Sequence, residues 1–491
     1  MRVSAASAAG ERPRRSRLPR PAPAVLAALG GIAALPEAAS AHGLVQRTDL
    51  PIPEWLFAWG ASGVLIVSFV ALAVAWPTPR LRTVPWRPLP AVGRALTGRA
   101  WGVIGGSAGV ALLGLVVVAG YIGPQEPTDN LAPTLVLIVF WVGLAFTSVL
   151  AGDLFRLLNP WRALGEVAGW VTARLGRRPR RDRRPYPERL GHWPAAIGML
   201  AFTWVELASG WGEQPDRLAT AAVVYTVVTL AAMSVYGVRP WIENGETFSV
   251  YFGLLARMSV FERRGRRVGL RPPLAGLAGF AARPGTVALI SVMIGSVSFD
   301  GLSQGGTWGA LAVQLNQRLL SLGAPIGTAI VIASTLGLLL CVGLVAGFYK
   351  LGVAGVQRSG GTAGQTDLAR AFAHALVPTA FAYVVAHYLT YLIHEGQAIG
   401  YLASDPLGRG WDLFGTASAG IDFTLISQTT AWYLQVAAVV IGHIGGLALA
   451  HDRALVRFPS PEAAIRSQYW LLGVMVGFTT LALWLLAESS A

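Results

Sequence analysis

The chain has 491 residues, 54% of them hydrophobic and 13% charged, and a mean hydropathy of +0.53. Soluble domains carry about twice this charged fraction, so the composition excludes a soluble globular protein and indicates a polytopic α-helical membrane protein. The formal net charge of +14 does not indicate nucleic-acid binding, because the arginines concentrate in short loops between apolar runs, as the positive-inside rule describes.

Residues 1–41 have the pattern of a cleavable signal peptide. A basic stretch at 11–20, ERPRRSRLPR, precedes an apolar run at 23–35 that is too short to span a bilayer. The sequence Ala-Ser-Ala at 39–41 then matches a signal-peptidase site. Cleavage after it would make His42 the first residue of the mature chain, outside the cytoplasmic membrane.

A free N-terminal histidine offers an amine and an imidazole nitrogen in one chelate, which suits Cu(II). This start, His42 after an Ala-rich signal, resembles the mature N-terminus of CopC-like periplasmic copper proteins. The resemblance implies that His42 is a copper ligand. The alternative is that His42 only follows a convenient cleavage site.

Ten apolar segments after the signal peptide are candidate membrane spans. Together they predict an all-α fold, a polytopic transmembrane helical bundle that forms a single integral membrane domain over residues 42–491. The segments are roughly 55–76, 102–120, 131–151, 192–209, 217–236, 284–300, 324–348, 370–394, 426–449 and 468–487.

The loops between these segments alternate in charge. Those at 77–101, 173–190 and 262–271 are rich in arginine and are expected in the cytoplasm, whereas GPQEPTDN and GWGEQPD are acidic and are expected outside. The alternation predicts a multi-pass protein of the cytoplasmic (plasma) membrane with both mature termini extracytoplasmic. The lipid bilayer is its expected partner, and nucleic acid is not.

A short motif, PWxxxGE, occurs twice, and each copy follows a helix that is expected to end inside. The arrangement suggests a parallel internal repeat over about 102–180 and 182–262. Proline suits the first turn of a helix and tryptophan the membrane interface, so both copies are expected to be amphipathic helices on the cytoplasmic surface. The alternative is chance identity. The motif residues are Pro160, Trp161 and Glu166 in one copy, and Pro240, Trp241 and Glu246 in the other.

The eighth span, 370–394, is the richest in polar residues at membrane depth. Burying an ionisable group there is costly, so each one is a functional suspect. His387 and His394 are seven residues apart and lie within about 20° on one helix face. Tyr383 and Tyr391 flank His387 at i−4 and i+4 and are candidates for a substrate or proton path.

Two acidic residues of other spans are expected on the same side of the membrane as His387 and His394. Asp300 ends the sixth span and Glu206 lies near the end of the fourth, so both are expected near the outer surface. Two or three imidazoles with a carboxylate suit Cu(II), zinc or another divalent metal, with His42, His387 and His394 as ligands. A proton- or substrate-binding polar face and purely structural pairing are the alternatives.

An inner set of histidines comprises His374, His443 and His451. If the outer and inner sets line one route, His374 and His443 belong to a transport path. The chain has no Walker A motif, so no nucleotide is expected as a cofactor, and it has neither HExxH nor GxSxG. The single cysteine, Cys341, excludes a disulfide framework and a cysteine-based metal site.

The start of the mature chain, AHGLVQRTDLPIPEWLFAWG, together with FDGLSQ at 299–304 and the layout of the spans, resembles actinobacterial polytopic membrane proteins named fenitrothion hydrolase-like. The resemblance runs over most of the chain and implies cleavage of an organophosphate ester. Organophosphate hydrolases use two metals held by several histidines and carboxylates, and the HxH start of their motif is absent here. The activity would therefore need a smaller metal-hydroxide site, with Asp300 or Glu206 as the base.

Three classes of function follow from the sequence. The first is a transport or metal-handling membrane protein with a His/carboxylate site on the extracytoplasmic side, copper being the leading metal. The second is a membrane-embedded, metal-dependent organophosphate hydrolase. The third is a non-catalytic component that assembles with a membrane or periplasmic partner protein, with the PWxxxGE segments as cytoplasmic docking sites.

Overall fold

The structure is a computed structural model in which residues 54–81, 84–91, 93, 98–175, 184–265, 267–359 and 367–488 are described. Over these residues the chain is a bundle of helices, and eight of the helices are long and apolar enough to cross a membrane. The predicted all-α polytopic class is confirmed. The predicted signal peptide, 1–41, and His42 lie outside the described residues, so cleavage and the N-terminal copper ligand stay predictions.

Each of the ten predicted spans corresponds to a helix or to consecutive helical segments. Eight reach spanning length, and two correspond to the shorter apolar helices Trp59–Ala75 and Trp193–Leu207. In chain order the ten are α2 (Glu54–Ala75), α4 (Arg99–Ile122), α5–η3–α6 (Leu131–Pro133, Thr134–Gly143, Leu144–Ala151), α9 (Trp193–Leu207), α10 (Pro215–Tyr236), α14 (Thr286–Ser303), α16 (Ile326–Ser359), α17–η4–α18 (Leu368–Phe372, Ala373–Leu376, Val377–Ile393), α20 (Gln428–Arg457) and α21 (Pro461–Glu488).

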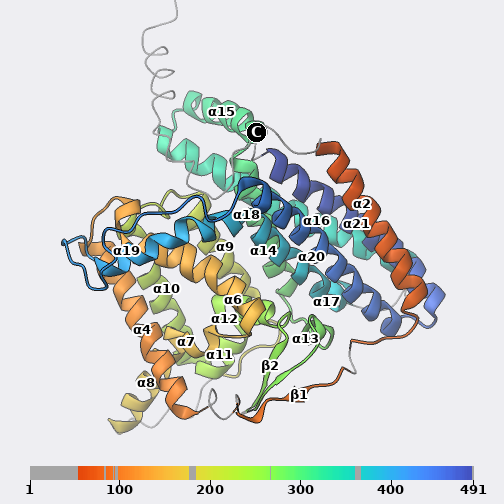
Figure 1. Cartoon of the computed structure of the whole chain (residues 1–491), viewed down its shortest axis with the longest axis horizontal. Coiled ribbons are helices and arrows are strands. Elements are labelled where there is room, and N and C mark those ends of the chain that lie inside the picture. Colours follow the sequence, from red (N-terminus) through yellow and green to blue (C-terminus); the bar gives the residue numbers. More distant parts are fainter. Residues whose placement is uncertain are drawn as a thin grey trace, which may run out of the picture. The chain divides into compact units, whose positions relative to one another are not determined.

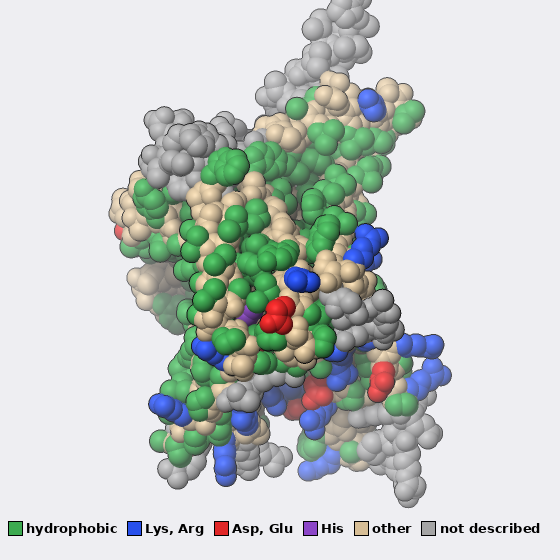
Figure 2. All heavy atoms as spheres, turned by 90° about the vertical axis from the view of Figure 1, so that its right-hand side faces the viewer, with side chains coloured by type: hydrophobic (Ala, Val, Ile, Leu, Met, Phe, Trp, Pro, Cys, Tyr) green, Lys and Arg blue, Asp and Glu red, His purple; other side chains and the backbone are tan. Residues whose placement is uncertain are grey.

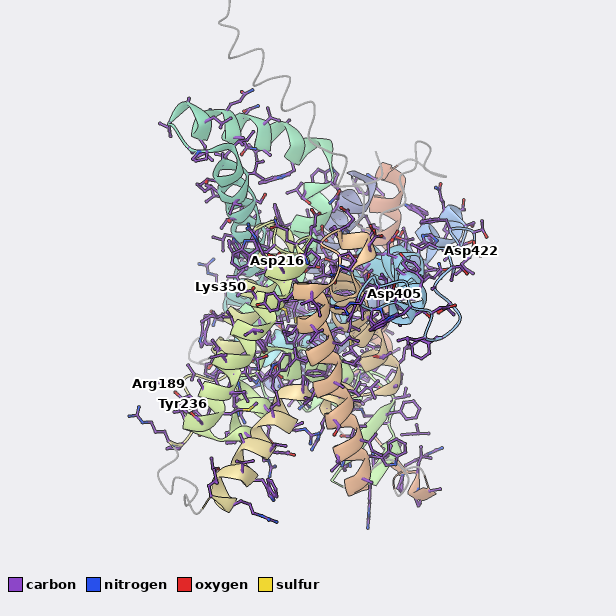
Figure 3. The ribbon with its side chains drawn as sticks, turned by 90° about the vertical axis from the view of Figure 1, so that its left-hand side faces the viewer. Arg189, Asp216, Tyr236, Lys350, Asp405 and Asp422 are labelled. Atoms are coloured by element: carbon purple, nitrogen blue, oxygen red, sulfur yellow. The ribbon has the colours of Figure 1, made fainter. Side chains whose placement is uncertain are left out.

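The bundle has two chemically different ends. Figure 3 shows Arg189 and Tyr236 toward the lower end of the view, and Asp216, Asp405 and Asp422, with Lys350, higher up. Figure 2 shows lysine and arginine side chains gathered toward the lower end, with a broad hydrophobic surface above them. We call these the basic end and the acidic end. The hydrophobic surface between them fits contact with lipid.

The interior of the bundle is built around α14. Its side chains are buried without a break from Leu289 to Gly301, and it packs on α9, α16 and α18. Gly295 allows α16 to approach, because a Cβ at this position would come within 2.6 Å of the Cα of Val342. A helix that is buried all round has no water beside it, so a polar side chain on α14 must find its partners inside the protein.

The first PWxxxGE copy follows a segment that turns back into the bundle. The short helix α7 (Phe155–Leu158) leads to α8 (Pro160–Arg174), and the turn between them lies against the middle of α4. Gly109 of α4 makes this contact possible, because a Cβ there would overlap the carbonyl oxygen of Leu158. Beyond its buried first turn, α8 is amphipathic, as predicted, and leaves most of its residues at the surface.

The second copy differs from the prediction. The short helix α11 (Val238–Asn244) leads to α12 (Thr247–Ala256), which is buried along most of its length and packs on α6 and α9. The physical reason is composition: α12 reads TFSVYFGLLA, with large apolar side chains on every face. Such a helix has no polar side to leave at a surface, so it is stable only inside the bundle.

A three-stranded antiparallel sheet joins two loops that the sequence analysis treats only as basic loops (Figure 1). β2 (Phe261–Arg264) and β3 (Arg267–Leu270) form a hairpin, and β1 (Arg87–Pro88) pairs with the other edge of β3. Glu262 forms an ion pair with Arg271 at 3.2 Å. The sheet therefore links the segment after α2 to the segment after α12.

α2 is fastened to the C-terminal half of the chain at the basic end. The Nε2 atom of His451, on α20, lies 2.9 Å from the carbonyl oxygen of Trp76. The neighbouring Asp452 accepts a hydrogen bond of 2.6 Å from the backbone N–H of Arg80. Along its length α2 packs on α20 and α21, so the first and last helices of the described chain are neighbours.

The acidic end carries elements that the sequence analysis leaves in loops. α15 (Gly306–Ser321) is an amphipathic helix that packs on α16, and it lies at the top of Figure 1. η5 (Glu395–Ala398) and α19 (Ile399–Ser404) follow α18. Gln397 of η5 holds the next loop, because its side-chain amide both donates to and accepts from the backbone of Asp422 at 3.0 Å.

Replacing Gly109 with alanine is expected to destabilise the protein by about 1–3 kcal/mol, because the added methyl group overlaps the Leu158 backbone at a close helix contact. The measurement is the midpoint of thermal unfolding in detergent. Gly114→Ala is the matched control, since a Cβ at this position of the same helix meets nothing within 4 Å. Equal midpoints for the two variants would contradict the packing described here.

Candidate functional site

Asp300 of α14 and His387 of α18 are in direct contact. The Oδ2 atom of Asp300 is 2.8 Å from Nε2 of His387, and Tyr388 donates a hydrogen bond of 2.7 Å to the same oxygen. His387 is 5% exposed and Asp300 is 1% exposed. The sequence predicts only that Asp300 and His387 share a membrane side, and the structure adds their contact.

Glu206 brings a second carboxyl group to this site from the last turn of α9. The charges of Glu206 and Asp300 act on each other, and both act on Tyr388. The Oε2 atom of Glu206 is sealed from solvent and has no hydrogen-bond partner among the described residues. The C-terminal end of a helix is the negative end of its dipole, so α9 does not compensate this carboxylate. We call Glu206, Asp300, His387 and Tyr388 the acid–histidine site.

Aromatic side chains of η3 and α12 pack beside α9, the helix that carries Glu206. Tyr251 of α12 stacks on Trp141 of η3 with ring centroids 4.8 Å apart, and both are almost fully buried. The charge of Glu206 acts on Tyr251. Within the described ranges, neither the Tyr251 hydroxyl nor Nε1 of Trp141 has a hydrogen-bond partner. Apolar walls of this kind lower the local dielectric and strengthen every charge interaction inside them.

His394 lies at the end of α18, apart from the Asp300 contact. It caps the helix, and its ring centroid is 5.4 Å from that of Phe423. The part of the chain that the structure describes contains no group of three His, Cys, Asp or Glu side chains placed to hold a metal ion. The predicted ligand set of His42, His387 and His394 includes a residue outside that part and stays a prediction.

The inner residues are buried and mostly bonded to backbone carbonyls. Tyr383 donates from its hydroxyl to the carbonyl oxygen of Phe478 at 2.8 Å. The Nδ1 atom of His443 is 2.7 Å from the carbonyl oxygen of Val439, one turn back on its own helix. The rings of Tyr383 and His443 are 6.3 Å apart, and His374 is 1% exposed. These residues face the interior, as a path would require, and the path itself stays a prediction.

The PWxxxGE motifs serve packing rather than a surface. Trp161 and Trp241 are only 5% and 8% exposed and so lie inside the protein, and their position at the membrane interface stays a prediction. The cause is local: the indole N–H of Trp161 donates to Thr226 of α10 at 2.9 Å, and Trp241 stacks on Tyr236. Both tryptophans therefore fill space between helices, as do the buried Pro160 and the partly buried Pro240 that precede them.

The two motif glutamates have opposite environments. Glu166 is exposed and forms a long ion pair of 3.7 Å with Arg162. Glu246 is fully buried and caps α12, accepting from the N–H groups of Phe248 at 3.0 Å and Ser249 at 2.8 Å. Its carboxylate also accepts from Tyr225 at 2.6 Å and from Asn159 at 3.0 Å. With four donors, Glu246 is a satisfied structural group and not a free ligand.

Glu246→Ala is expected to lower the free energy of unfolding by several kcal/mol, because each buried donor left without a partner costs about 1–3 kcal/mol. The measurement is unfolding in detergent followed by circular dichroism. Glu166→Ala is the matched control from the other copy of the motif, and its effect is expected within about 0.5 kcal/mol. A Glu246→Ala protein as stable as the parent would show that the four hydrogen bonds do not matter.

Sequence reasoning missed Tyr388 and Tyr225. Tyr388 follows His387 directly and so points to another face of α18, which a search at i and i+4 does not include. It reaches Asp300 because α14 packs against that face. A signal existed in the sequence, since Tyr388 is one of three tyrosines between positions 383 and 391. Tyr225 had none, because its partner Glu246 is on another helix.

Comparison of the chain with protein-family models, with curated proteins and with solved structures finds no match. The resemblances to fenitrothion hydrolase-like proteins and to CopC-like proteins are therefore neither supported nor contradicted. They stay predictions from the sequence, and the function rests on the site.

Proposed function

We propose that the chain is a membrane transport protein whose ion-binding site is the acid–histidine site, and that the ion bound there is a proton. Its support is the contact of Asp300 with His387 beside the second carboxyl group of Glu206. Intramembrane acids and histidines that face a bundle interior are typical of proton relays in pumps and transporters.

The charges of the residues at this site indicate that it binds a cation. Among Glu206, Asp300 and His387, even a protonated imidazole leaves one negative charge over if both carboxyl groups are ionised. Burying such a charge without a partner is costly, and Oε2 of Glu206 has no donor among the described residues. A proton on one of the carboxyl groups, or another cation bound at the site, removes the excess charge.

The positive-inside rule orients the proposed protein. With the basic end in the cytoplasm, the acidic end faces the extracytoplasmic side. Glu206 lies one residue before the end of α9, and Asp300 three residues before the end of α14, so the site is on the extracytoplasmic side of the bundle centre. The cytoplasmic (plasma) membrane remains the expected location.

Metal handling is the second candidate, because an imidazole nitrogen beside a carboxylate oxygen also suits Cu(II) or zinc. It requires at least one further ligand, for which His42 is the sequence's candidate. Organophosphate hydrolysis rests on the resemblance alone. A docking role for the PWxxxGE segments has lost its main support, since Trp161 and Trp241 are buried.

Infrared spectroscopy can separate a proton from a metal. In the metal-free protein at neutral pH, we expect a C=O stretching band of a buried protonated carboxyl group that is lost in Glu206→Gln and altered in Asp300→Asn. Glu166→Gln, at the exposed motif glutamate, is the control and should leave the band unchanged. An unchanged spectrum in Glu206→Gln, together with a tightly bound copper ion that His387→Ala releases, would replace the proton with a metal.

Proton movement tests the transport function itself. Liposomes that contain the full chain and an enclosed pH dye are given an inside-negative potential. We expect luminal acidification, and we expect Asp300→Asn and His387→Gln to slow it at least about tenfold, because a positioned proton-transfer group contributes roughly 10²–10⁴-fold. Glu166→Gln should retain the parent rate. Acidification that Asp300→Asn leaves unchanged would contradict the assignment of this site.

A further inference from the structure

Polar side chains lead from the acid–histidine site to the acidic end along one face of α18. Tyr391 lies one helical turn beyond His387, and its ring centroid is 6.3 Å from that of Tyr388. His394 follows at the end of the helix. Exposure rises in the same order, since His387 is buried whereas Tyr391 and His394 are partly exposed.

Carboxylates from two other elements stand at the outer end of this face. Glu395 begins η5 and is about half-buried, and burial raises its pKa while the neighbouring His394 lowers it. Glu213 is exposed in the turn after α9. That turn folds back on the helix end, because the N–H of Gly212 donates to the carbonyl oxygen of Val205 at 3.1 Å. We call Glu213 and Glu395 the acidic rim.

Tyr391 lies between the acidic rim and the buried acids. Along α18, Tyr391 comes after His387, which contacts Asp300, and before Glu395, which follows the helix. The carboxylates of Glu206, Glu395, Asp300 and Glu213 all affect Tyr391 electrostatically. Its own ring contact with Tyr388 joins it to the hydroxyl that binds Asp300. On this face of α18, the Tyr391 ring therefore lies between the end of the helix and the residues that contact Asp300.

We propose that the acidic rim and Tyr391 form the entry route by which small cations, the hydrated proton included, reach the acid–histidine site from the acidic end, with Tyr391 as the gate. The inference rests on the proposed function only for the identity of the site. Rim carboxylates raise the local concentration of cations, and low-dielectric walls focus their field inward. The phenol ring closes the route by its bulk.

Accessibility of a single thiol tests the route without any transport assay. The one native cysteine, Cys341, is replaced by serine, and His387→Cys places a thiol in the site. Membrane-impermeant methanethiosulfonates, one cationic and one anionic, are added to intact cells and to inside-out vesicles. Gly301→Cys is the second reporter, because a Cβ there meets the His387 ring only at ordinary contact distance, 3.8 Å, and keeps every site residue.

We expect labelling from outside the cell, about tenfold faster with the cationic than with the anionic reagent, in line with electrostatic steering into a charged cleft. Neutralising the rim with Glu213→Gln and Glu395→Gln should remove this preference. Tyr391→Ala should speed labelling by both reagents about tenfold, as removal of a closed gate would, whereas Tyr391→Phe, which keeps the bulk, should not. A thiol at Gln317 on the exposed face of α15 is the control, and its rate should not respond to any of these changes.

Labelling only from inside-out vesicles would overturn the entry route. So would labelling rates that change neither when the acidic rim is neutralised nor when Tyr391 is replaced by alanine. This failure can be told apart from failure of the proposed function. If labelling follows the expectation but Asp300→Asn liposomes still acidify normally, the route stands and the proton-transport assignment falls. If labelling fails while Asp300→Asn abolishes acidification, the site stands and the route falls.

Discussion

The capping of α12 by Glu246 is the interaction on which the interior of this bundle depends. A helix placed inside a bundle exposes its first N–H groups to an environment without water, and Glu246 satisfies two of them while it is itself held by α10 and by the turn before α8. With that end secured, α12 can occupy the interior and place Tyr251 against Trp141. The wall beside Glu206 follows from this cap.

The protein thus contains two kinds of carboxyl group with an oxygen sealed from solvent. Each oxygen of Glu246 accepts two hydrogen bonds, so a proton on either oxygen would compete with a donor that is already bound there. Glu206 has an oxygen with no donor among the described residues and a like charge nearby. The hydrogen bonds of Glu246 favour its ionised form, whereas the surroundings of Glu206 favour its neutral form. Glu246 is therefore a structural acid, and Glu206 is the acid to which the proposed function assigns a proton.

The sequence predicted what depends on composition along the chain and missed what depends on contacts across it. Hydropathy located every described helix of spanning length, since burial in lipid acts on each segment separately. Asp300 and His387 were assigned to one side because helix ends can be counted, but their contact depends on how α14 packs against α18. The interior position of α12 was missed because Pro-Trp at its approach also fits an interfacial helix, and the short sheet was missed because its strands pair across distant loops. The burial of Trp161 was missed for the same reason as the position of α12, because Pro-Trp also fits an interfacial helix.

The neighbourhood of α2 with α20 and α21 sets the order in which the molecule can be completed. Ribosomal synthesis delivers α2 before its two partners, so the contacts of α2 with α20 and α21 can form only after most of the chain has been made. His451 and Asp452 form hydrogen-bond contacts with the backbone groups of Trp76 and Arg80. Until α20 is made, those backbone groups can bond only to water. Closure of the bundle is therefore a late event of biogenesis, and a chain that stops before α20 leaves α2 without these two protein neighbours.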